Sequence, residues 1–138
     1  MKSEFKRAVA SEDAPAGRGP FPQAIQVGPL VFVSGQGPIA QATNRPIEGD
    51  FSAQVRKTFE NLANILKAAD LDLTHVVKVT VYLSDLTRVE EFNKLYESLM
   101  PQPFPARTLV QAGLRGIDVE MDAIAARPSI AAWAAAAV

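Results

Sequence analysis

Residues 75–83 read His-Val-Val-Lys-Val-Thr-Val-Tyr-Leu. Alternation of this kind predicts a β-strand, because successive side chains of a strand point to opposite faces of the sheet. The side chains predicted to face helices are apolar: Val77, Val79, Val81 and Leu83. Those on the other face are semi-apolar: Val76, Lys78, Thr80 and Tyr82. An uncovered sheet face either bends into a barrel or meets another subunit, so we expect a homo-oligomer.

Two amphipathic helices are predicted, one on each side of this strand in the sequence. Apolar residues at three- and four-residue steps mark the first, behind Asp50 as a candidate N-cap: Phe51, Val55, Phe59, Leu62, Leu66 and Ala69. The second opens with Thr87-Arg88-Val89-Glu90, which has the spacing of a capping box, and ends at Pro101 and Pro103. One face of each helix is therefore expected to be buried.

The remaining strand signals complete the fold prediction. Strands are expected over 24–27, 30–33, 106–110 and 117–125, with 5–9 as an edge strand. Residues 43–49 are expected to form a loop, and Gly113-Leu114-Arg115-Gly116 a hairpin turn. The resulting ββαβαββ order predicts an α+β fold, in which a mixed sheet of about six strands carries both helices on one face.

Composition narrows the class of protein. A chain of 138 residues, 48% hydrophobic, fits one domain over residues 1–138. Fourteen basic and 15 acidic residues give no excess of positive charge for nucleic acid or an anionic membrane. With no cysteine and one histidine, His75, which we expect in a loop or at an edge, we predict no metal and no cofactor. The first residues lack the apolar run of a signal peptide, so a cytoplasmic protein is expected.

Arg107 and Glu120 are the candidate catalytic pair. Arg107 follows Phe104-Pro105-Ala106 and should project from a strand, where its planar guanidinium suits a carboxylate. Strict alternation over 117–124 puts Glu120 on one face with Asp118 and Asp122. If that face is partly buried, at least one carboxyl pKa should rise and favour proton transfer. The alternatives are an ion-paired arginine and a solvated row of acids.

Five further residues complete the candidates, and for Ser34, Gly35, Asn93 and Leu109 a role in substrate binding is only what the family resemblance described next implies. Phe21 lies between two prolines in Gly19-Pro20-Phe21-Pro22-Gln23-Ala24, where a ring can cover a small ligand or join the core. Ser34 and Gly35 end a strand where glycine permits close approach to the backbone. Asn93 lies on the second predicted helix, either near a cleft or facing solvent. Leu109 follows Arg107 by two residues.

Together, the segments around Phe21, Val33-Ser34-Gly35-Gln36-Gly37-Pro38 and Phe104–Thr108 resemble the Rid (YjgF-type) family of enamine/imine deaminases, from about residue 8 to 127. The resemblance implies a chorismate-mutase-like fold and a homotrimer with clefts between subunits. It implies that Arg107 binds the substrate carboxylate and that Glu120 orients the attacking water. The backbone near Gly35 and Leu109 would contact substrate and water, although many relatives have tyrosine at Phe21 and cysteine at Leu109.

The function implied is cofactor-free hydrolysis of 2-imino or enamine acids, such as 2-aminoacrylate, to 2-oxo acids and ammonia. A non-catalytic trimer that binds small carboxylate metabolites is the alternative, and an endoribonuclease is disfavoured by the charge balance. Residues 128–138, alanine-rich with Trp133, lie beyond the resemblance. They are expected to form a frayed helix or packing appendage, with an interface anchor through Trp133 as the alternative.

Overall fold

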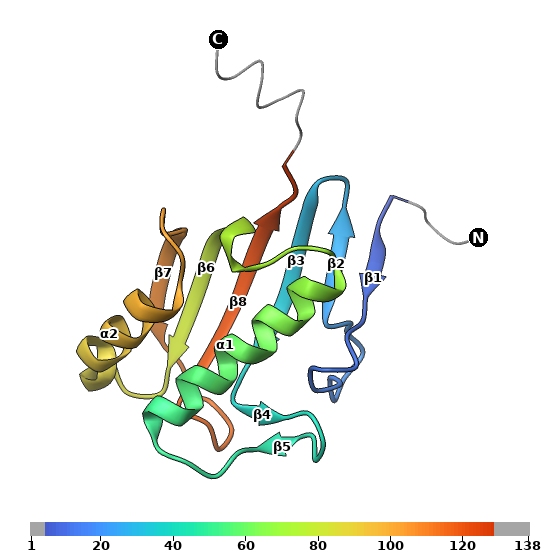
Figure 1. The fold of residues 1–138 in the computed structure, drawn as a ribbon. Helices are drawn as coiled ribbons and strands as arrows, with labels where there is room; N and C mark the ends of the chain where they lie inside the picture. Colours follow the sequence, from blue (N-terminus) through green and yellow to red (C-terminus); the bar gives the residue numbers. More distant parts are fainter. Residues whose placement is uncertain (1–4, 129–138) are drawn as a thin grey trace.

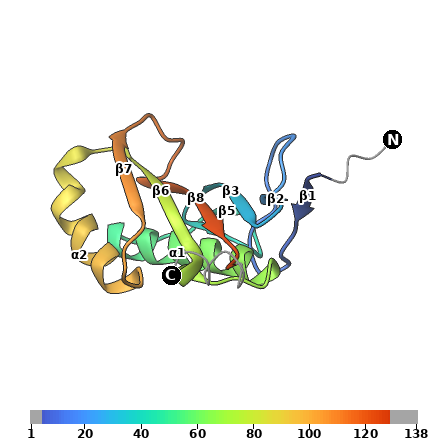
Figure 2. The same cartoon turned by 90° about the horizontal axis from the view of Figure 1, so that it is seen from above.

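The computed structural model describes residues 5–128, so the predictions for Trp133 and its alanine-rich surroundings lie outside it. Six strands form one sheet in the order β1-β2-β3-β8-β6-β7, and both helices cover the same face (Figures 1 and 2). The strands are β1 (Arg7–Val9), β2 (Ala24–Val27), β3 (Leu30–Gln36), β6 (Val76–Leu83), β7 (Ala106–Gln111) and β8 (Val119–Ala126). Only the β6–β7 pair is parallel, which confirms the predicted mixed sheet.

The first helix, α1 (Phe51–Ala68), is the main cover of the sheet. The Asp50 carboxylate accepts a hydrogen bond of 2.9 Å from the backbone N–H of Ala53, which confirms the predicted N-cap. The apolar face of α1 meets alternating residues of the central strands. The core side chains that are completely inaccessible to solvent include Val55, Leu62, Ile65, Leu66, Val79, Val81, Leu83 and Met121.

The second helix, α2 (Val89–Leu99), ends before Pro101 as predicted, but its predicted start was wrong. The residue before the helix, Arg88, makes no side-chain capping bond. Instead, Asp85 caps a short 3-10 turn, Leu86–Arg88, by accepting hydrogen bonds from the N–H and hydroxyl of Thr87. Asp85 therefore caps the turn that leads into α2, and the Thr87 hydroxyl donates to this carboxylate.

One residue of β6 departs from the predicted alternation. Val79, Val81 and Leu83 are buried under the helices, whereas Val77 is 48% exposed and Val76 takes the buried place. An irregularity in the pairing with β8 between Val76 and Lys78 causes this reversal. His75 precedes the strand in a 3-10 turn, in keeping with its predicted place in a loop.

The connection between β7 and β8 is not the predicted hairpin turn. β8 lies between β3 and β6, so the chain from β7 passes over β6 before it pairs again. Ala112 and Ser84 anchor this passage, because their N–H groups donate to the carbonyls of Leu83 and Asp118 respectively. Residues 43–49 also hold more structure than the predicted loop, since β5 (Arg45–Pro46) pairs there with β4 (Ile39–Ala40).

The second face of the sheet carries no helix in the described part of the chain (Figure 2). Large apolar side chains are exposed on it: Phe32, Val77 and Val110 are 40–48% accessible. We call this surface the open face. No helix within residues 5–128 is long and apolar enough to span a membrane.

A buried asparagine ties α1 to the end of β3. Both side-chain N–H groups of Asn61 donate 2.9 Å hydrogen bonds, one to the carbonyl of Gly37 and one to that of Ile39. The residue is inaccessible to solvent, so water cannot replace these bonds. Asn61 therefore fixes the path of the chain immediately after Gly35, which is a candidate site residue.

We expect Asn61→Ala to lower the free energy of unfolding by about 1–3 kcal/mol, because it removes both side-chain hydrogen bonds, although the Gly37 carbonyl keeps a donor in the N–H of Ile39. The matched control is Asn64→Ala on the same helix, which removes a single exposed bond to the carbonyl of Asp13. We expect the control to cost about 0.5 kcal/mol. Equal losses in urea unfolding of the two variants would contradict a structural role for Asn61.

Candidate functional site

Arg107 lies on the helix-covered side of the edge strand β7. Its partner in the parallel register is the buried Val79, and its guanidinium stacks 4.8 Å from the ring centroid of Tyr96. The Nη2 group of Arg107 donates a 2.8 Å hydrogen bond to Oδ1 of Asn93. Asn93 therefore belongs to the arginine site and is not merely a solvent-facing helix residue. The alternative of an ion-paired arginine does not hold, because Arg107 forms no salt bridge within residues 5–128.

Glu120 lies on the open face, beside Tyr82 of β6. Burial raises the pKa of its carboxyl group above the ordinary value, and the nearby charge of Asp122 raises this pKa further. Asp122 is itself engaged, because its Oδ2 atom accepts a 2.9 Å hydrogen bond from the Tyr82 hydroxyl. The predicted rise in a carboxyl pKa on this strand is thus found at Glu120.

The predicted row of three carboxylates on one face was wrong for Asp118. Its Oδ2 atom accepts a 2.9 Å hydrogen bond from the side chain of Gln54 on α1, and its Oδ1 atom accepts one of 2.8 Å from Ser84. Gln54 also accepts from the backbone N–H of Asp118. The side chain therefore turns toward α1, because Asp118 precedes β8 and is not held by the alternation of the strand.

Gly35 leaves room for the Glu120 carboxyl group. A Cβ atom placed on Gly35 would lie 2.6 Å from Oε2 of Glu120, so any side chain at this position would force the carboxyl group to move. Glycine therefore lets the backbone of β3 approach the carboxyl group in its present position. The contact places Gly35 beside Glu120, and the predicted contact of its backbone with substrate remains a prediction.

Phe21 is half exposed, at 50%, so it is not the core aromatic that was the alternative. Its ring lies against Gly17 and Gly19, where added Cβ atoms would come within 2.8 Å of ring carbons. The Ser34 hydroxyl donates a 2.8 Å hydrogen bond to the carbonyl of Pro22, which holds this segment to β3. Ser34 thus positions the neighbourhood of Phe21, and its predicted contact with substrate remains a prediction.

Leu109 packs against the core, beside Val81 in the register of β6 and β7. Its side chain is therefore turned away from the open face. Only its backbone is available for the predicted contact with water, and that contact remains a prediction.

The candidate residues form two groups that one chain does not bring together. Arg107 and Asn93 lie at the helix-covered side of the sheet edge, whereas Glu120, Gly35 and Phe21 belong to the open face and its rim. The interpretation of Arg107 and Glu120 as a pair within one short segment was therefore wrong for a single chain. The register of the strands explains the separation. Arg107 is paired with Val79 of β6, whereas Glu120 is paired with Tyr82 of the same strand. The side chains of Val79 and Tyr82 point to opposite faces of the sheet, and so do those of their partners.

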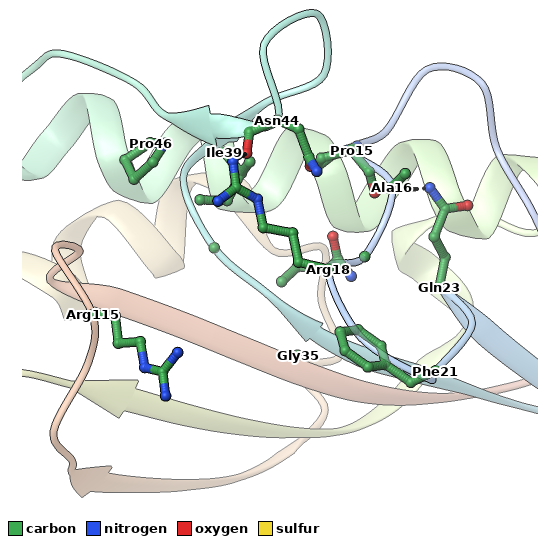
Figure 3. A pocket seen from close by; sticks show the side chains of 13 residues that line it. Pro15, Ala16, Arg18, Phe21, Gln23, Gly35, Ile39, Asn44, Pro46 and Arg115 are labelled. Carbon is green, nitrogen blue, oxygen red and sulfur yellow. Dashed lines mark hydrogen bonds between the residues drawn. The ribbon is translucent and has the colours of Figure 1, made fainter.

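A cavity of about 300 Å³ opens beside Phe21 and Gly35 (Figure 3). Two arginines missed in the sequence, Arg18 and Arg115, line it from separate loops. A usable signal existed, because both residues are charged side chains in glycine-containing turns, Gly17-Arg18-Gly19 and Gly113-Leu114-Arg115-Gly116. Such turns are typical of surface segments that carry function. Residues 5–128 contain no group of three potential metal-ligating side chains, and the need for no cofactor stays a prediction.

Substitution Glu120→Gln tests the environment of the carboxyl group. Because the pKa is raised in the folded state, the free energy of unfolding of the wild type should fall as the pH rises from about 4.5 through the folded pKa. The glutamine variant has no carboxyl group to ionise, so its free energy of unfolding does not fall in this way. We therefore expect its Tm to be higher than that of the wild type at pH 7, and the two Tm values to be equal well below pH 4.5. Thermal unfolding from pH 3.5 to 8 checks this, with the exposed Glu12→Gln as control; a lower Tm for Glu120→Gln at pH 7 would contradict it.

Comparisons with known proteins agree with this arrangement. The model of the family described as "Endoribonuclease L-PSP" matches residues 11–127. A 2-iminobutanoate/2-iminopropanoate deaminase of Salmonella typhimurium is 36% identical over 128 residues, which covers 89% of this chain and 99% of the relative. Protein DfrA of Myxococcus xanthus is 40% identical over 129 residues, with 91% and 98% covered.

A solved structure shows the same fold. The structure of RidA from the Antarctic bacterium Psychrobacter sp. PAMC 21119 has a TM-score of 0.82 at 36% identity and covers 87% of this chain and 98% of its own. Sequence and structure thus agree over nearly the whole length of both chains. The chain belongs to the YjgF/RidA/RutC family, the Rid family.

Proposed function

We propose that the chain is a cofactor-free deaminase that hydrolyses 2-imino and enamine acids, such as 2-aminoacrylate, to 2-oxo acids and ammonia. The observation that carries the proposal is the Glu120 carboxyl group, which is half-buried over Gly35 with a raised pKa. A carboxyl pKa moved toward neutrality lets one group first accept and then return a proton. The deaminase name of the Salmonella typhimurium relative supports the same reaction class.

In the proposed reaction, water attacks the carbon of the protonated imine while the Glu120 carboxylate accepts a proton from the water, which gives a neutral carbinolamine. The protonated carboxyl group then gives this proton to the carbinolamine nitrogen, and as the C–N bond breaks the carboxylate accepts the hydroxyl proton, so that ammonia and the 2-oxo acid are released. An enamine first takes a proton at its β-carbon and so becomes the same protonated imine. Free imines already hydrolyse in water, so positioning and proton transfer need to supply only a modest acceleration.

We further propose that the site is completed in a homotrimer, where Arg107 of one subunit meets Glu120 of the next. Support comes from the separation of the two groups in one chain and from the exposed apolar residues of the open face. Arg107 already lies at a free sheet edge, with Asn93 and Tyr96 holding its guanidinium. An arginine fixed in this way can bind the substrate carboxylate with two parallel hydrogen bonds. A cytoplasmic location, expected from the sequence, remains part of this proposal.

The first test uses 2-aminoacrylate generated in situ by a serine dehydratase, with release of 2-oxo acid as the readout. We expect the wild type to accelerate release, and Arg107→Ala and Glu120→Gln to lower kcat/KM by about 100-fold or more. The exposed Arg56→Ala and Glu12→Gln are matched controls that should keep full activity. No acceleration by the wild type, with intact binding of 2-oxobutanoate, would favour the metabolite-binding alternative.

Gly35→Ala tests the positioning of the carboxyl group separately. Since an added methyl group would meet Oε2 of Glu120 at 2.6 Å, the carboxyl group must move aside while the backbone keeps its conformation. We expect kcat to fall about tenfold or more, with Tm within a few degrees of the wild type. Unchanged kcat in steady-state assays would show that the position of Glu120 over Gly35 is not needed for the reaction.

A further inference from the structure

The cavity beside Phe21 carries positive charge that the proposed reaction does not use. We call it the arginine cavity, after Arg18 and Arg115. None of the residues that line it is an aspartate or glutamate, so the two guanidinium groups face a lining without negative charge. Neither arginine forms a salt bridge within the described residues. Two cations that line one cavity without a counter-charge in its lining are typical of a site for an anion.

Arg18 is exposed to solvent, but a hydrogen bond anchors its side chain. Its Nη2 group donates a 2.6 Å hydrogen bond to the backbone carbonyl of Asn44, across the cavity from its own segment. Figure 3 shows the side chain of Arg18 extending through the cavity toward Asn44, while Arg115 enters from the connection between β7 and β8. A guanidinium group has five N–H donors, so this anchoring bond leaves most of the donors of Arg18 available to a ligand.

The surrounding loop is also fixed. The side-chain amide of Gln23 donates hydrogen bonds of 3.0–3.2 Å to the carbonyls of Ser11, Ala14 and Pro15. Pro15 belongs to the lining, as do Phe21 and Gly35. These bonds fix the backbone that forms the wall of the cavity beside Arg18. A site built on fixed segments loses less entropy when it binds a ligand.

The arginine cavity adjoins the proposed reaction centre. Gly35 lines the cavity and at the same time lies against the Glu120 carboxyl group. A substrate whose imine carbon lies at Glu120 would therefore extend its side chain past Gly35 and Phe21 toward the two arginines. This path gives the cavity a role in the choice of substrate.

We propose that Arg18 and Arg115 select 2-imino acids whose side chain bears a second carboxylate. This inference rests on the proposed function, because it assigns the specificity of the same site. In the assembled site, Arg107 of the neighbouring subunit would hold the carboxylate next to the imine, and Arg18 with Arg115 would hold the distal one. An apolar side chain would instead separate two guanidinium groups from water without replacing their hydrogen bonds, which is unfavourable.

The kinetic test compares two imines of the same chain length, generated in situ by oxidases from D-glutamate and D-norvaline. We expect wild-type kcat/KM for 2-iminoglutarate to exceed that for 2-iminopentanoate by about tenfold, and the preference to weaken with added salt. Arg18→Leu and Arg115→Leu should remove the preference and leave hydrolysis of 2-iminopentanoate within about twofold of the wild type. Arg56→Leu, an exposed arginine of α1, is the matched control.

Calorimetric binding of 2-oxoglutarate and 2-oxopentanoate separates this inference from the proposed function. Suppose that the wild type hydrolyses neither imine faster than the spontaneous rate, but binds 2-oxoglutarate more tightly than 2-oxopentanoate, and that Arg18→Leu abolishes this binding preference. In that case the distal carboxylate site is supported and the deaminase proposal fails. If both imines are hydrolysed with equal kcat/KM, or if Arg18→Leu slows both equally, the arginine cavity does not select a second carboxylate and the inference is overturned.

Discussion

The two-residue alternation of β8 is the constraint on which the rest of the structure depends. β8 lies in the centre of the sheet, and its buried residues Val119, Met121 and Ala123 anchor the core under the helices. Glu120 is consequently held on the open face, because the strand cannot turn one residue without turning its neighbours. Arg107 of β7 lies on the opposite, helix-covered face, because it is paired with the buried Val79 of β6. A single copy of the fold therefore separates the cation from the acid, and the proposed function requires a second copy to join them.

Two polar groups of the proposed site have unfavourable surroundings. Burial raises the pKa of Glu120, and the buried hydroxyl of Tyr96, like the buried Oδ1 atom of Asn61 elsewhere in the core, has no hydrogen-bond partner within residues 5–128. Burial raises the pKa of Tyr96 as well, and the charge of Arg107 partly offsets this effect. Such groups cost folding free energy, which the apolar core supplies, and are typical of residues retained for function.

Sequence patterns predicted the elements that burial specifies strongly. The helix after Asp50 and the alternation of β8 were predicted because each element buries one continuous apolar face. Apolar residues every three or four positions fit only a helix, and apolar residues at every second position fit only a strand. The patterns also placed Arg107, Glu120 and Gly35 among the candidates. Their steric relation, with the Glu120 carboxyl group over the backbone of Gly35, depends on pairing between strands distant in sequence and was not predictable from either segment alone.

The wrong predictions share a physical cause, which is competition between local pattern and tertiary pairing. Val77 was placed in the core because alternation does not reveal an irregular pairing with β8. The 113–116 segment resembled a hairpin turn because its glycines fit a tight turn. In the sheet, however, β6 lies between β7 and β8, so the two strands are not neighbours and no hairpin joins them. Arg18 and Arg115 were missed because only the fold brings their loops to one cavity.

The most direct test of the shared site mixes two inactive variants, Arg107→Ala and Glu120→Gln, by joint unfolding and refolding in equal amounts. If the subunits of trimers mix at random, half of all sites receive an intact Arg107 and half of these an intact Glu120, so the account predicts recovery of about a quarter of wild-type activity over the whole preparation. Mass spectrometry of intact assemblies would establish that mixed oligomers have formed. Activity no higher than that of either variant alone, in a preparation that contains mixed oligomers, would contradict a site shared between subunits.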